Sequence, residues 1–263
     1  MQFTAQIDPT IRETILAELS RIEANHDVRL LFAVESGSRA WGFPSPDSDY
    51  DVRFVYAHKR DWYLSLTPGR DVIELPISGD LDINGWDIRK ALNLLLKPNP
   101  VLLEWLSSPV RYLWDDTTCA ALTELAQQVS HGTACRHHYL NLGEGQYRRH
   151  IADAGAVNYK KYFYCLRPAL ALRWVRMLPD RQPPMNLQAL MAEIDLDQTV
   201  TARIADLLEL KAKAKETGDG PRIPEIDTLI EAEFTLARQA DPSAVPARHH
   251  DRATALFRQI IDR

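Results

Sequence analysis

Cysteine is scarce in this sequence, and long apolar runs are missing from it. The 263 residues include three cysteines without Cys-x-x-Cys spacing, an odd number that argues against a disulfide framework and favours a reducing compartment. No run approaches the roughly 18 apolar residues that a membrane span requires, and the first residues lack the apolar core of a signal peptide. We therefore expect a cytoplasmic protein without a membrane partner.

An excess of positive charge is also missing. Lys and Arg number 31 against 36 Asp and Glu, so the formal net charge is −5 and the chain is not a general polyanion binder. Contacts with phosphate must then come from a local basic region. One such region runs from Arg136 to Arg176, where eight basic residues against two acidic ones give a local charge of +6. Tyr and Phe residues alternate with these cations, a mixture suited to phosphate contact and base stacking.

The length admits one large domain or two modest ones. The first part of the chain mixes short apolar runs typical of strands with helical spacing, whereas beyond residue 116 we find helical spacing and no strand. This segregation predicts an α+β fold, in which a small mixed sheet with flanking helices spans residues 1–115 and a helical C-terminal domain spans residues 116–263. The expected strands cover residues 28–34, 51–57, 71–76 and 80–84.

The most informative stretch is FAVESGSRAWGFPSPDSDYDVRFVY, residues 32–56. A strand ends at Gly37 and Ser38, and Asp49 and Asp51 alternate at the start of the next strand, so both carboxylates face one side. Two neighbouring carboxylates repel each other, and a bound cation usually compensates them. Magnesium prefers such hard oxygen ligands and completes its shell with water and phosphate. The backbone amides of Gly37 and Ser38, with the serine hydroxyl, are candidates for holding the β and γ phosphates of a nucleotide.

This pattern of a Gly-Ser pair, a ten-residue spacer and Asp-x-Asp resembles the nucleotidyltransferase superfamily of the DNA polymerase β type. The neighbouring words GSRAWG, SDYDVR, DINGWDIRKAL, NPVLLEWLSSP and KKYFYCLRPALALRW are similar to its RlaP-type subfamily of RNA-repair nucleotidyltransferases. The resemblance covers roughly residues 30–175. It implies the nucleotidyltransferase fold, with the helical domain contributing basic residues to the cleft.

The resemblance also implies three catalytic carboxylates that bind Mg²⁺ or Mn²⁺. Asp49 and Asp51 would ligate both metals, and Asp82, on a strand just before a helix, would hold the catalytic metal and help to deprotonate the acceptor hydroxyl. Asp80 and Glu74 remain alternatives for the third acid, whereas Asp87 has the position of a first-turn residue favoured by the helix dipole. The implied reaction is in-line attack on the α-phosphorus of a nucleoside triphosphate, with pyrophosphate leaving.

The basic region supplies candidates for binding the triphosphate. Lys160, Tyr164 and Arg167 stand at i, i+4 and i+7, so one helical face can present two cations and a ring. We assign Lys160 or Lys161 to the triphosphate, and Arg167 is a second candidate because a planar guanidinium can bind phosphate through two hydrogen bonds.

The function predicted from these features is metal-dependent transfer of a nucleoside monophosphate from a nucleoside triphosphate to an acceptor hydroxyl, for which an RNA end is the favoured acceptor. One alternative is a non-catalytic nucleotide-binding or RNA-binding protein, such as the antitoxin half of a two-protein module. Another is transfer of AMP to a protein hydroxyl. The sequence leaves open whether the chain forms a homo-oligomer or works with a partner protein.

Overall fold

The computed structural model describes residues 4–67, 69–97, 99–129, 131–213, 218–240 and 249–263. Its contacts divide the chain into two compact units, which we call the sheet unit and the helical unit. The sheet unit consists of Ala5–Ala40, Asp49–Ser130 and Val245–Arg263, and the helical unit consists of Met1–Thr4, Trp41–Ser48 and His131–Ala244.

The sheet unit contains five strands in the order β3-β4-β2-β1-β5. Only the β2–β4 pair is parallel, and the other neighbours are antiparallel, so the sheet is mixed as predicted. The fifth strand, β5, lies in a stretch where the sequence predicted none. The strands are β1 (Val28–Glu35), β2 (Tyr50–His58), β3 (Val72–Glu74), β4 (Leu81–Asp87) and β5 (Arg111–Trp114).

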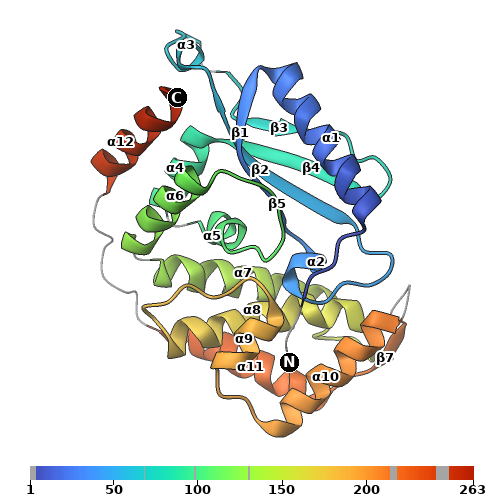
Figure 1. Cartoon of the computed structure of the whole chain (residues 1–263). Helices are drawn as coiled ribbons and strands as arrows, with labels where there is room; N and C mark the ends of the chain where they lie inside the picture. Colours follow the sequence, from blue (N-terminus) through green and yellow to red (C-terminus); the bar gives the residue numbers. More distant parts are fainter. Residues whose placement is uncertain (1–3, 68, 98, 130, 214–217, 241–248) are drawn as a thin grey trace. The chain divides into compact units, whose positions relative to one another are not determined.

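Helices flank this sheet (Figure 1). The first, α1 (Pro9–His26), begins where Asp8 caps the backbone amides of residues 10 and 11, and its buried apolar face joins one core with β1 and β2. The helices α4 and α6 contact β2 and β1, respectively, and α12 packs on α4. The remaining bounds are α2 (Ser38–Trp41), α3 (Arg60–Tyr63), α4 (Ile88–Leu96), α5 (Pro100–Leu106), α6 (Asp116–Gln128) and α12 (His250–Ile261).

The helical unit is built around α8, a helix whose middle is largely buried and which packs against α7, α9 and α11. We predicted no strand beyond residue 116, and this prediction is wrong in one detail, because two three-residue strands pair there. The elements are α7 (Gly132–His150), β6 (Ala156–Asn158), α8 (Tyr159–Met177), α9 (Leu187–Glu193), α10 (Gln198–Lys213), β7 (Asp219–Pro221) and α11 (Pro224–Gln239).

The bounds of the two units differ from the division at residue 115 that we expected from the sequence. Helix α6 groups with the sheet because it packs on β1, and α12 groups with the sheet because it packs on α4. The segment of residues 41–48, between α2 and β2, groups with the helical unit. Among the described residues, no helix combines the length and the apolar character needed to cross a bilayer.

Candidate active site in the sheet unit

Two of the predicted carboxylates stand side by side on neighbouring strands. In the parallel pairing of β2 and β4, Asp51 lies directly opposite Asp82. Neighbouring strands are about 4.8 Å apart, and side chains at paired positions leave the sheet on the same face. About 30% of each side chain is exposed, so both carboxylates border solvent.

Arg53 bridges this pair. It follows Asp51 by two residues on β2 and therefore projects from the same face. Its Nη2 atom donates to Asp82 Oδ2 at 2.6 Å and to Asp51 Oδ1 at 3.3 Å, and its Nη1 atom donates to the carbonyl oxygen of Asp82 at 2.8 Å. The guanidinium thus partly neutralises two carboxylates that would otherwise repel each other.

The surroundings of Asp51 disfavour its ionised form. Burial raises its pKa, and the charges of Asp82 and Asp49 raise it further, whereas Arg53 and Arg39 lower it. Asp49 lies just before β2 and is exposed. A carboxylate in this state gains from an additional cation, because a nearby positive charge favours its ionised form.

The glycine-serine corner is packed against Asp51. The Ser36 amide donates to the carbonyl oxygen of Asp51 at 2.8 Å, and Gly37 is buried beside that residue's carboxylate. A Cβ atom at Gly37 would lie 1.8 Å from Asp51 Oδ2, so only glycine leaves room for the carboxylate. Ser38 begins α2, which is a single turn.

Glu35 is a member of this site that our sequence analysis missed. It ends β1 and is fully buried. Its Oε1 accepts a hydrogen bond from the Asp51 amide at 2.8 Å, and its Oε2 accepts one from the Tyr112 hydroxyl at 2.5 Å. Burial raises its pKa to about 7. An acid that ends an apolar strand directly before Ser-Gly-Ser was the available signal.

The donor set around Asp51 and Asp82 fits a hard divalent cation. The groups are carboxylate oxygens, and Mg²⁺ commonly uses only one or two of them together with water and substrate phosphate. Within the described ranges, however, no three Asp, Glu, His or Cys side chains form a ready-made metal cluster. The pair on β2 and β4 is therefore the nucleus of the candidate site, and Asp49 is an exposed neighbour of it.

The predicted phosphate-binding cations lie on α8, in the helical unit. Arg167 is buried, its Nε donates to the carbonyl oxygen of Met185 at 2.9 Å, and its guanidinium lies 4.9 Å from the centre of the Trp41 ring. Lys160 and Lys161 are partly exposed. The acids and these three cations thus belong to different units.

Comparisons with known proteins agree with the motif. The family model described as RlaP, RNA repair pathway DNA polymerase beta family, matches residues 11–259. The chain belongs to this family and is an enzyme of the polymerase β-like nucleotidyltransferase type, with the α+β fold predicted from its sequence.

Two individual proteins are similar to the chain. The uncharacterized protein YcgL of Bacillus subtilis (strain 168) is 42% identical over 255 residues, which cover 96% of each chain. A nucleotidyltransferase-like protein from Exiguobacterium sibiricum 255-15 aligns with 94% of this chain and 80% of its own, at 12% identity and a TM-score of 0.29.

Proposed function

We propose that this protein transfers a nucleoside monophosphate from a nucleoside triphosphate to a hydroxyl at an RNA end, releasing pyrophosphate. The observation that carries the proposal is the placement of Asp51 opposite Asp82, beside a glycine at which an added Cβ atom would displace the Asp51 carboxylate. The family's description as part of an RNA repair pathway supports RNA as the acceptor.

In this proposal the candidate site residues of the sheet unit have separate roles. Asp51 and Asp82, with Asp49, hold Mg²⁺ or Mn²⁺, and Gly37 and Ser38 bind the triphosphate through their amides and hydroxyl. The bound metal supplies charge neutralisation at the phosphates and lowers the pKa of the acceptor hydroxyl. Asp82 then accepts the proton of that hydroxyl.

The proposal keeps the predicted cations of the donor triphosphate, which lie in the helical unit. They are Lys160 or Lys161, with Arg167 as a second candidate. Their cationic groups would offset the charge of pyrophosphate as it leaves, which is how arginine and lysine commonly assist phosphoryl and nucleotidyl transfer.

The test uses the purified full chain, each of the four α-labelled nucleoside triphosphates, Mg²⁺ and a single-stranded RNA pool. We expect label in RNA, and a loss of about 100-fold, or about 3 kcal/mol of transition-state stabilisation, in Asp51→Asn and Asp82→Asn. Asp49→Asn is expected to lose transfer as well. The matched controls are Asp80→Asn and Glu74→Gln, which neutralise the alternative third acids and should transfer like the wild type.

The outcomes separate the competing functions. Wild-type transfer by both Asp51→Asn and Asp82→Asn would contradict the metal site. Label in protein rather than RNA would indicate transfer of AMP to a protein hydroxyl. Nucleotide binding without incorporation into any acceptor would indicate a non-catalytic binding protein.

A further inference from the structure

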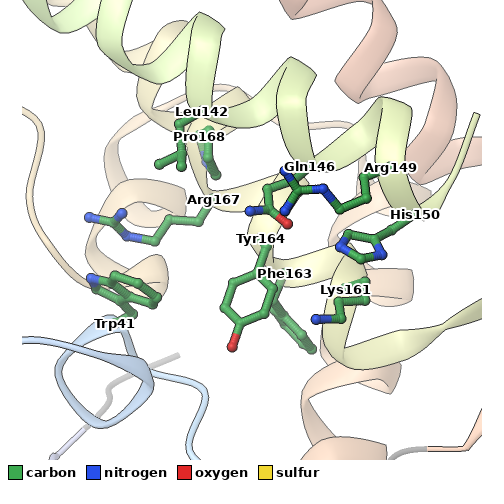
Figure 2. A pocket seen from close by; sticks show the side chains of 10 residues that line it. All are labelled: Trp41, Leu142, Gln146, Arg149, His150, Lys161, Phe163, Tyr164, Arg167 and Pro168. Atoms are coloured by element: carbon green, nitrogen blue, oxygen red, sulfur yellow. The ribbon is translucent and has the colours of Figure 1, made fainter. Parts of the chain in front are cut away.

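The helical unit contains a pocket of about 260 Å³ between α7 and α8. Figure 2 shows Arg149 and His150 reaching it from α7, and Lys161 and Tyr164 reaching it from α8. Trp41 forms one end of the pocket. The volume lies just below the usual range of small-molecule pockets, about 300–1,000 Å³, and suits a ligand portion of about one nucleotide.

The pocket carries positive charge without a matching acid. None of the described residues that line it is an Asp or Glu. Arg149 is exposed, and its guanidinium makes no hydrogen bond or ion pair within the described ranges. The Lys161 ammonium lies 5.4 Å from the centre of the Tyr164 ring. Both charges act on His150, whose pKa is lowered first by burial and then by Lys161 and Arg149.

Three other arginines of the same unit do pair with an acid. Arg203, Arg222 and Arg238 each make an ion pair with a carboxylate, at 3.2, 2.8 and 2.6 Å, respectively. Two cations that repel each other in a concave site gain free energy when an anion enters it. Arg149 and Lys161 therefore mark a site for an external anion.

Aromatic side chains give the pocket a second property. Tyr164 and Phe163 form its wall on α8, and the indole of Trp41 lies 6.3 Å from the Tyr164 ring. Proteins that bind single-stranded nucleic acids combine aromatic rings with cations, because the bases stack on the rings while the phosphates contact the cations.

We propose that this pocket binds the terminal, phosphate-bearing nucleotide of a single-stranded RNA, with the phosphate at Arg149 and Lys161 and the base against Tyr164 and Trp41. A terminal phosphate carries a charge of about −1.5 to −2 at neutral pH, which matches two cations better than a triphosphate does. The inference rests on the proposed function for the identity of RNA as acceptor, and it leaves Lys160 as the lysine for the donor triphosphate.

The experiment measures binding of short single-stranded RNA by fluorescence anisotropy in EDTA, so that neither a metal nor turnover contributes. Three RNAs of one sequence are compared, with a 5′-phosphate, a 3′-phosphate or no terminal phosphate. We expect one phosphorylated end to bind about tenfold more tightly than the unphosphorylated RNA. Arg149→Glu and Lys161→Glu should abolish this preference and reduce the salt dependence of binding.

The matched control is Arg148→Glu, since Arg148 is the adjacent exposed arginine on α7, does not line the pocket and bonds to the carbonyl oxygen of Glu144 in its own helix. It should keep the preference within about twofold. The proposal is overturned if the wild type does not distinguish the three RNAs, if Arg149→Glu keeps the preference, or if a phosphopeptide binds as tightly as RNA. Asp51→Asn should bind RNA like the wild type, so a failure of the proposed catalysis and a failure of this pocket give different results.

Discussion

Replacing Gly37 by alanine is the sharpest test of the site geometry. The added methyl group would lie 1.8 Å from Asp51 Oδ2 and 2.6 Å from Asp51 Cγ, both far inside van der Waals contact. The buried backbone at the end of β1 is fixed by strands on both sides. The carboxylate of Asp51, which is the more mobile partner, must therefore rotate away.

The magnitude follows from what Asp51 loses. Its Oδ1 atom accepts a 3.3 Å hydrogen bond from Arg53, and rotation breaks that bond and places the side chain off its preferred rotamer, at a cost of about 1–2 kcal/mol in folding free energy. The effect on activity is larger, because a displacement of about 1 Å at a catalytic group can cost about 100-fold in rate. We expect Gly37→Ala to stay folded and to lose about 100-fold in nucleotide transfer.

The assay combines nucleotide transfer with urea unfolding of the same preparations. Gly145→Ala is the matched control, since Gly145 lies within α7 and an added Cβ there meets nothing within 4 Å. It should transfer like the wild type and be more stable by about 1 kcal/mol, the helix-propensity difference between glycine and alanine. Wild-type transfer by Gly37→Ala would refute the assignment of Asp51 to the reaction centre.

Two further predictions concern charges that the fold partly or wholly buries. Lys211 is 1% exposed and bonds to the carbonyl oxygen of Phe43, and burial lowers its pKa from 10.5 to about 8. Between these two pH values the unfolded chain binds one more proton than the folded chain, so the unfolding free energy of the wild type relative to Lys211→Met should rise by up to about 3 kcal/mol from pH 8 to pH 10.5. Urea unfolding measures this difference, and a difference that does not change with pH would contradict the burial of a charged lysine. Removing the bridging guanidinium in Arg53→Met should destabilise the metal-free protein by about 2 kcal/mol, and Mg²⁺ should then raise the melting temperature of the variant more than that of the wild type. The control Arg70→Met, which removes an exposed ion pair, should change stability by less than about 1 kcal/mol. Equal Mg²⁺ shifts in Arg53→Met and the wild type would show that the metal does not bind at Asp51 and Asp82.

The sequence predicted the local part of the site because its signals are local. A strand that ends at Gly37 and a second strand that begins near Asp51 are set by apolar runs and turn residues close to them in the chain. The period of two along β2 likewise predicts that Asp51 and Arg53 share a face. The fold class followed from the same reasoning.

The remainder depends on the order of strands, which short-range patterns do not determine. Arg53 reaches Asp82 because β2 pairs with β4, and Glu35 meets Tyr112 because β1 pairs with β5, a strand that the sequence analysis did not predict. The first contact joins residues 29 positions apart in the sequence, and the second joins residues 77 positions apart. A buried acid at the end of β1 therefore had no predictable partner.

The count of charged residues between Arg136 and Arg176 shows how much basic charge this region carries, but it does not show where the side chains point. Lys160 and Lys161 are consecutive on α8, so their side chains point about 100° apart around the helix. The charge of Lys160 acts on Asp47 and Lys211, whereas that of Lys161 acts on His150. One basic region in the sequence thus supplies two separate surroundings in the structure.

The ten-residue spacer of the motif has a structural reason of its own. Within the helical unit, Gln188 Nε2 donates to the carbonyl oxygen of Gly42 at 2.6 Å, and the Lys211 ammonium donates to that of Phe43. Gly42 has a φ of 89°, and a Cβ atom there would lie 2.0 Å from Gln188 Oε1, so this position requires glycine on two grounds. The spacer is covalently continuous with Ser38 on one side and Asp49 on the other. Helices α9 and α10 therefore hold the segment that joins Gly37-Ser38 to Asp49, which explains why a spacer rich in proline and serine can have one defined path.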